Sequence, residues 1–228
     1  TAGESNVTDF TGADAILYTV FDGKNWSEPD TLYNGTSGSV MGLEAAMLKD
    51  GTAAITYTLD KGSADEAAGL RTNSSVQHTT EDYEIVYAVV GADGEVRKNQ
   101  QITSDSELDE NPQITTAEIS GQEYYILAWY NVSTTGSEEK GDQKSVSDIR
   151  LAAIDSMGNI RTSEIGFVDS LTNAAGGQNV GVDSNFRFVR SEDRDVNSLS
   201  LIWASTAGDQ KEDSQDVTDS GILRAVRF

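Results

Sequence analysis

The chain of 228 residues contains no cysteine, a single histidine and two prolines. Without cysteine it has no disulfide framework, no thiolate zinc site and no cysteine nucleophile. The one histidine, His78, lies in a polar stretch, so it cannot belong to a histidine metal cluster. Nothing in the sequence around it indicates a Ser-His-Asp triad. No apolar run approaches the roughly 18 residues that a membrane-spanning helix needs.

Positive charge is also scarce. The chain has 38 acidic and 16 basic side chains, for a formal net charge of −22. A charge of this sign repels polyanions, which argues against nucleic acid and anionic membrane surfaces as direct partners. Acidic loops favour cations, basic proteins or neutral ligands such as sugars. The sequence starts at Thr1 with no signal segment, and we expect an extracellular or cell-surface protein, of bacterial type.

Short catalytic motifs are missing as well. The sequence has no nucleophile elbow, phosphate-binding loop, dinucleotide fingerprint or His-Glu-x-x-His pair. We therefore assign no catalytic residue, no metal ligand and no cofactor from motifs.

What the sequence does have is a repeat. Four segments of alternating, β-branched character begin near residues 15, 84, 148 and 221, and their leading isoleucines are Ile16, Ile85, Ile149 and Ile222. Spacings of about 64 to 73 residues with variable loops are typical of a repeated sheet unit. After the first three segments a turn with glycine follows, and we predict return strands beginning near Trp26, Val96 and Ile160.

A second hairpin is predicted between these units. Its first strand covers 43–48, 114–119 and 186–189, and its second strand covers 53–57, 125–129 and 199–203. The second strands align Tyr57, Trp129 and Trp203 between apolar neighbours, which predicts a core between sheets. Each repeat thus contains four short strands, the content of one β-propeller blade. We predict an all-β fold, a β-propeller or partial propeller of four-stranded antiparallel blades, with residues 1–228 as a single propeller segment.

The stretches 15–32 (AILYTVFDGKNWSEPDTL), 42–58 (GLEAAMLKDGTAAITYT) and 99–130 (NQQITSDSELDENPQITTAEISGQEYYILAWY) resemble blades of bacterial β-propellers of the BNR or Asp-box, sialidase-like type. The resemblance covers residues 15–228. The segment Asp22 to Trp26 keeps the Asp, Gly and Trp of an Asp-box with compressed spacing. Sialidase chemistry, as the family implies it, needs an arginine triad, a tyrosine nucleophile with a glutamate, and an acidic acid/base residue. These roles cannot be assigned to residues here.

The repeat also predicts where a ligand would bind. Six long connections should open on one face of the propeller, namely 33–40, 60–81, 104–111, 131–146, 169–184 and 205–220. Rigid scaffolds usually carry their binding sites on such loops. The alternative is that these loops are tolerated insertions.

Five residues are candidate ligand-binding residues. Trp26 and Tyr33 flank an exposed hairpin and could stack on a sugar, while Asp105, Glu107 and Asp109 alternate in an acidic loop. We interpret that loop as solvated, with calcium, which takes about six to eight oxygen ligands, as the possible alternative.

Three functions stay open. The first is a non-catalytic module of a secreted or cell-surface protein that binds a glycan or protein through the long-loop face. The second is a fragment of a glycoside hydrolase or lyase propeller, and the third is a structural spacer. Because two full units are flanked by incomplete ones, we also expect an open ring, completed by further blades or by self-association.

Overall fold

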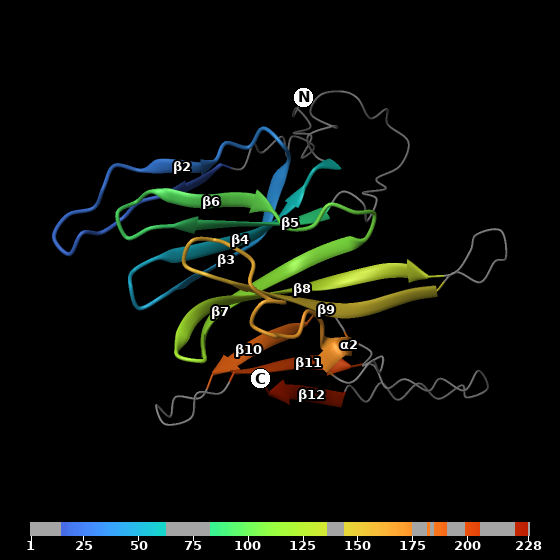
Figure 1. The fold of residues 1–228 in the computed structure, drawn as a ribbon. Helices are drawn as coiled ribbons and strands as arrows, with labels where there is room; N and C mark the ends of the chain where they lie inside the picture. Colours follow the sequence, from blue (N-terminus) through green and yellow to red (C-terminus); the bar gives the residue numbers. More distant parts are fainter. Residues whose placement is uncertain are drawn as a thin grey trace, which may run out of the picture.

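The computed structural model describes residues 15–62, 83–135, 144–174, 182, 185–190, 199–205 and 222–227. The described part is all-β, as predicted, and its strands form four antiparallel sheets, none of them closed into a barrel (Figure 1). No helix among the described residues is long and apolar enough to cross a membrane.

Within each sheet, strands that are neighbours in sequence are neighbours in space. The sheets are the pair β1–β2, the four strands β3–β4–β5–β6, the three strands β7–β8–β9 and the three strands β10–β11–β12. Their bounds are β1 Ile16–Tyr18, β2 Asp30–Tyr33, β3 Ser39–Met47, β4 Ala53–Asp60, β5 Tyr83–Val90, β6 Val96–Gln101, β7 Leu108–Ile119, β8 Gln122–Thr135, β9 Lys144–Ile154, β10 Phe186–Arg190, β11 Leu199–Ser205 and β12 Ile222–Arg227. A four-residue helix, α2 (Leu171–Ala174), packs against β9.

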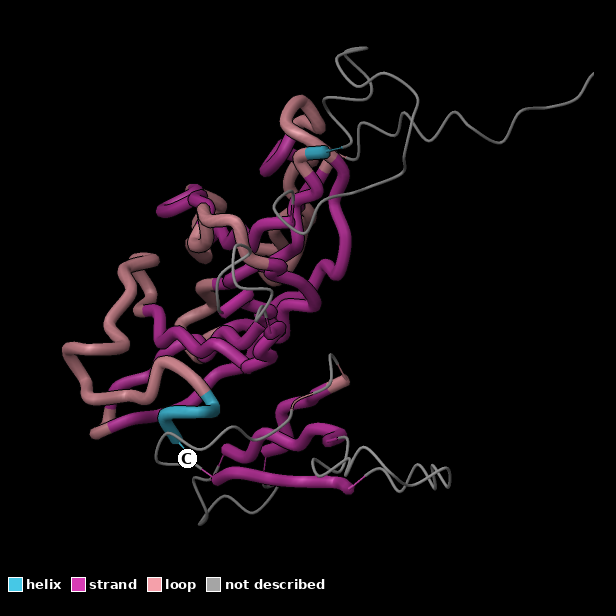
Figure 2. Tube along the Cα trace, turned by 90° about the vertical axis from the view of Figure 1, so that its right-hand side faces the viewer, coloured by secondary structure: helices cyan, strands magenta, loops and turns pink. Residues whose placement is uncertain are grey.

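The sheets pack face to face in the order of the sequence (Figures 1 and 2). One core cluster lies between the first and second sheets, another between the second and third, and another between the third and fourth. Tyr57, Trp129 and Trp203 belong to these clusters, with exposed fractions of 2%, 8% and 4%. Their predicted place in the core between sheets is confirmed.

One predicted strand is wrong. The return strand expected from Ile160 is reduced to a single bridge between Ile160 and Ile154, after which the chain turns at 162–166. The chain turns back on itself there: Ile165 N donates to the Arg161 carbonyl at 3.0 Å and Phe167 N donates to the Thr162 carbonyl at 2.9 Å. Arg161 also pairs with Asp155 and Glu164 at 2.8 and 2.7 Å. The chain returns to the sheet only at Ser170, which bridges to Arg150.

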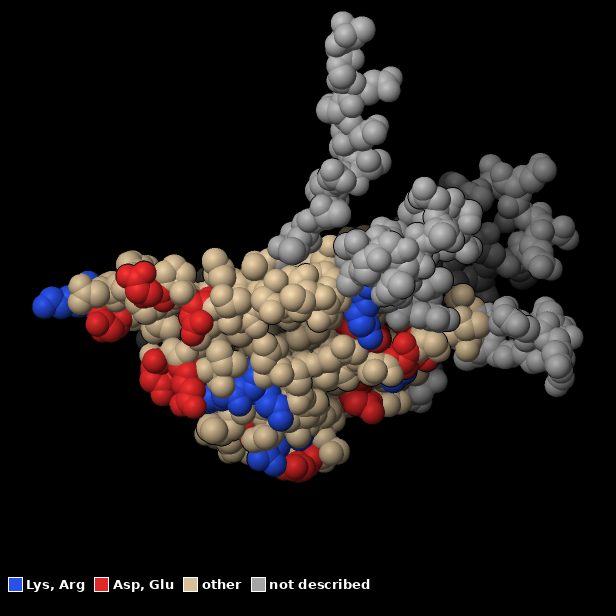
Figure 3. All heavy atoms as spheres, turned by 90° about the horizontal axis from the view of Figure 1, so that it is seen from above, with Lys and Arg blue, Asp and Glu red and all other residues tan. Residues whose placement is uncertain are grey.

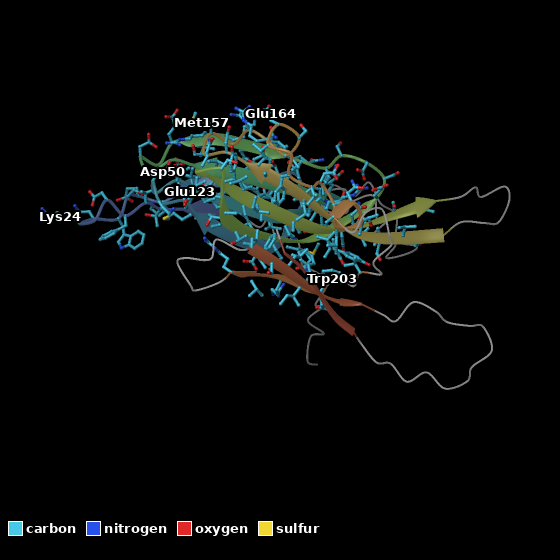
Figure 4. All side chains as sticks on the ribbon, turned by 60° about the horizontal axis from the view of Figure 1, so that its bottom comes forward. Lys24, Asp50, Glu123, Met157, Glu164 and Trp203 are labelled. Atoms are coloured by element: carbon cyan, nitrogen blue, oxygen red, sulfur yellow. The ribbon has the colours of Figure 1, made fainter. Side chains whose placement is uncertain are left out.

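The two ends of the sheets differ. The short-turn end is defined by the turns 49–51, 91–95, 120–121 and 155–159. Here side chains of one sheet bind at or beside the turns of a neighbouring sheet. The Tyr18 hydroxyl donates to the Gly94 carbonyl at 2.9 Å, and the Tyr87 hydroxyl donates to the Gly158 carbonyl at 2.8 Å. The Tyr125 hydroxyl donates to the Thr52 carbonyl at 2.6 Å. These bonds fix neighbouring turns to one another. Figure 4 labels Asp50 and Met157 in these turns, and Glu123 at the start of β8 beside them.

The opposite end, which we call the long-connection end, is where the longer connections leave the sheets. Ser39, Asp60 and Tyr83 lie side by side in the second sheet, and Leu108, Val132 and Ser147 do so in the third. The connections that follow or precede these residues therefore emerge at one end, as the repeat predicts for these two sheets. Most residues of the connections 60–81, 131–146, 169–184 and 205–220 lie outside the described part.

Candidate functional site

The five predicted site residues do not form one site. Trp26 lies on the hairpin between β1 and β2, near the short-turn end. Tyr33 ends β2, and Asp105, Glu107 and Asp109 precede or open β7, all at the long-connection end. A ligand at either end would contact only part of the predicted set.

The two aromatic candidates have different surroundings. Trp26 is 68% exposed, and its ring lies 5.0 Å from that of Phe21. Tyr33 instead packs at the edge of the core, with its ring 5.8 Å from that of Tyr57. Its hydroxyl donates to the Gly38 carbonyl at 2.7 Å, so it shapes the connection into β3. Of the pair, Trp26 is the side chain that presents an open ring face.

A polar network occupies the long-connection end of the third sheet. Asp109, only 1% exposed, accepts hydrogen bonds at Oδ1 from the indole Nε1 of Trp129 at 2.8 Å and from Nδ2 of Asn131 at 2.9 Å. Asn131 Nδ2 also donates to Glu107 at 2.9 Å, and Arg150 Nε donates to Asn131 Oδ1 at 3.4 Å. We call these five residues the Asp109 network. It ties the start of β7 to β8 and β9.

Local strand geometry explains why Asp109 turns inward. It sits directly opposite Asn131 in the β7–β8 pairing, so their side chains share a face. Two residues later the register shifts, and Asn111 adopts φ 52°. Gly42 takes φ 62° at the matching register shift of β3, and a Cβ there would lie 3.3 Å from Pro112 Cδ. The two bulges thus meet where β3 and β7 pack closely.

Burial raises the pKa of Asp109 to about 6, and the negative charges of Asp105 and Glu84 act in the same direction. The hydrogen bonds from Asn131 and Trp129 lower the pKa and only partly offset burial. Oδ2 of Asp109 is buried with no hydrogen-bond partner among the described residues. The neighbouring Glu110 also has its pKa raised by burial. An unpaired buried oxygen favours the protonated form.

Glu84 is a second buried carboxylate at this end. It is 2% exposed, binds Lys61 Nζ at 2.8 Å and accepts the Thr103 hydroxyl at 2.7 Å. The Thr103 hydroxyl oxygen in turn accepts the amide of Ile85 at 2.9 Å. Glu84 is therefore fully paired and holds the connection after β6 against β5.

The acidic loop does not gather its carboxylates around one point. Asp105 Oδ1 accepts the amide of Glu107 at 2.8 Å, which closes a local turn, while Glu107 and Asp109 bind Asn131. Among the described residues there is no group of three or more acidic or histidine side chains placed to hold a metal ion. Calcium binding, the alternative to a solvated loop, stays untested.

A cavity of about 450 Å³ lies away from this network, at the short-turn end between the third and fourth sheets. It is lined mainly by apolar side chains where the chain leaves the sheet edge, including Ile119, Ile165, Phe167 and Leu199. Its charged lining residue, Glu118, pairs with Lys49 at 3.1 Å. None of the five predicted site residues lines it, and we do not place the candidate site there.

Sequence reasoning missed Asn131, Arg150 and Glu84. A recurring pattern marks Asp109 rather than these three: Asp-x-Asn occurs at 109–111 and again at 183–185, each one strand before a core tryptophan, Trp129 or Trp203. Asp183, in the second copy of this pattern, lies outside the described residues.

No family model matches the chain, and no curated protein matches it significantly. The function therefore has to be argued from the fold and the Asp109 network.

Proposed function

We propose that the chain is a non-catalytic binding module of a secreted or cell-surface protein, built as a partial β-propeller, and that it binds a glycan or a protein at its long-connection end. Three features support the blade interpretation: consecutive antiparallel strands in each sheet, face-to-face packing in sequence order, and close packing of the first strands β3 and β7. The sheets correspond to blades whose first strands lie nearest one another.

The observation that carries the proposal is the contrast between the two ends. The short-turn end is closed by hydrogen bonds from Tyr18, Tyr87 and Tyr125 to neighbouring turns. The long-connection end holds the longer loops on a base stiffened by the Asp109 network. Variable loops on a rigid base are the usual arrangement of a binding face.

The charges at this end restrict the ligand. The exposed carboxylate of Asp105 and the partly exposed Glu107 add to the overall charge of −22. Polyanionic glycans are disfavoured, and neutral glycans or basic protein surfaces fit best.

The buried carboxyl of Asp109 does not favour the alternative of a hydrolase fragment. Its pKa of about 6 would suit a general acid. However, its side chain is 1% exposed and one oxygen holds Trp129 and Asn131, so it cannot reach a substrate bound outside the sheet. Its position is that of a support for the binding face.

The proposal is tested by a glycan array, with neutral and sulfated glycans, combined with binding to basic and acidic protein ligands. We expect binding to neutral glycans or to basic proteins, and at least tenfold weaker binding by the double variant Asp105→Ala/Glu107→Ala. Met157→Ala, at an exposed turn position of the short-turn end, is the matched control and should bind as the wild type does. Equal losses in both variants, or turnover of a bound glycan, would contradict the proposal.

A further inference from the structure

The first sheet exposes an uncharged, largely apolar strip. Leu17, Thr19 and Phe21 occupy alternating positions on the side opposite the core residues Ile16 and Tyr18, and Thr31 pairs with Leu17. Leu17, Phe21 and Trp26 are 60%, 50% and 68% exposed. We call Leu17, Thr19, Phe21, Trp26 and Thr31 the Leu17 strip. Figure 3, seen from above, shows a broad uncharged surface beside acidic side chains.

In the next repeat the matching positions are buried. Counting from Ile16 and Ile85, Leu17, Thr19 and Phe21 correspond to Val86, Ala88 and Val90. These three are 5%, 0% and 4% exposed, because they pack against the first sheet. Ala152 and Ile154 of the third sheet are likewise buried, against the second. In the second and third sheets, the surface that matches the Leu17 strip thus receives the preceding sheet, with Arg150 at the position of Leu17 in the third.

The last sheet presents the other half of the same interface. Phe186, Leu201 and Trp203 face the third sheet, so Arg187, Val189 and Ile202 lie on the opposite side. Val189 is 46% exposed. Ile202 matches Ala128 in the repeat, and Ala128 is fully buried between the third and fourth sheets. This side of the last sheet faces away from the other three sheets (Figure 1).

We propose that a second copy of this chain docks the outer side of its last sheet, β10–β11–β12, on the Leu17 strip. The distribution of charge favours this contact over one between the Leu17 strips of two copies. Exposed Asp22, Glu28 and Asp30 outnumber exposed Lys24 beside the strip, whereas Arg187 is exposed on the outer side of the last sheet. Strip on strip would bring acidic residues together in a chain of charge −22.

Such a contact is heterologous, since it joins two different surfaces of the chain. Repeated contacts of this kind give rings or open filaments rather than closed dimers. The same interface geometry that stacks four sheets within the chain would continue from one copy to the next. The long-connection end stays free in this arrangement.

The test is sedimentation velocity of the full chain over a concentration series from micromolar to several hundred micromolar in 150 mM NaCl. We expect wild-type protein to form species larger than a dimer as concentration rises. Leu17→Asp and Val189→Asp each remove one half of the interface and should leave monomers. Both positions are exposed, so circular dichroism should show an unchanged fold. Met157→Asp, at a 55% exposed turn position, is the control and should associate as the wild type does.

Mixing the two variants gives the sharpest outcome. Leu17→Asp keeps an intact last sheet and Val189→Asp keeps an intact strip, so an equimolar mixture should form a one-to-one dimer and nothing larger. A monomeric wild type at every concentration would overturn the proposal. So would continued association of Val189→Asp, which would mean strip-to-strip contact, or a sugar that quenches Trp26 fluorescence on a monomer, which would make the strip a glycan platform.

Discussion

At the scale of single residues, Asp109 carries the most specific prediction. Its pKa in the folded chain is raised from 3.8 to about 6 by burial. A carboxyl with a raised pKa contributes stability that is complete below the unfolded value and lost as pH rises through the folded one. We expect this contribution to be lost between about pH 4 and pH 6, by an amount on the order of 3 kcal/mol.

Asp109→Asn isolates the effect, because the amide oxygen can still accept from Trp129 and Asn131 while the charge is gone. Urea unfolding from pH 4 to pH 8 measures the free energy of unfolding of both proteins. The two values should be equal near pH 4, and the variant should become more stable relative to the wild type as pH rises. Asp109→Ala leaves the Trp129 and Asn131 donors unpaired and should destabilise by about 1–3 kcal/mol at every pH. If the difference in the free energy of unfolding between wild type and Asp109→Asn does not change with pH, Asp109 does not ionise in this pH range and the prediction is wrong.

The same residue shows how far sequence reasoning reaches. The alternation of Asp105, Glu107 and Asp109 predicts three like side chains in a solvated loop. In the structure Asp109 instead lies opposite Asn131 inside β7, because strand pairing begins at Leu108. Where a strand begins depends on its partner strand, and composition alone does not fix that point.

At the scale of elements, the hydroxyls of the strand tyrosines act as links between sheets. Tyr87 is fully buried, donates to Gly158 and accepts from Gln100 Nε2 at 2.7 Å. Tyr87→Phe leaves both partners unpaired and should cost about 1–3 kcal/mol. Tyr18→Phe, at the matching position of β1 and only partly buried, should cost less. Thermal unfolding of both variants measures which substitution destabilises the protein more. An equal loss of stability in the two variants would contradict the role of burial.

The sequence predicts where most strands lie, but it does not predict that the return strand after Ile160 is missing. The recurring isoleucines locate β1, β5, β9 and β12, and the aromatic positions locate β4, β8 and β11. The strand expected after Ile160 stops after one bridge, because the chain closes a hydrogen-bonded turn at residues 161–167 and leaves the edge of β9. A repeat alignment averages over such local turns and cannot anticipate them.

At the scale of the whole molecule, four sheets stack into a row within a chain that carries a net charge of −22. Like charges repel more strongly in the folded chain than in the extended one, and salt screens this repulsion. The Debye length falls from about 30 Å at 0.01 M to about 10 Å at 0.1 M ionic strength. We therefore expect the melting temperature to rise with NaCl over this range and to level off above it.

A separate melting-temperature experiment tests calcium, since a divalent cation screens charge and can also bind at a specific site. At matched ionic strength, a site in the acidic loop of Asp105 and Glu107 would raise the melting temperature further with Ca²⁺ than with Mg²⁺, and Asp105→Ala would remove the excess. Screening alone gives equal curves for the two ions. We expect equal melting-temperature curves for Ca²⁺ and Mg²⁺. Asp105 accepts a hydrogen bond from the amide of Glu107, and Glu107 accepts one from Asn131, so these carboxylate oxygens are already bound to the protein. A calcium excess that Asp105→Ala abolishes would show that these carboxylates can turn outward together.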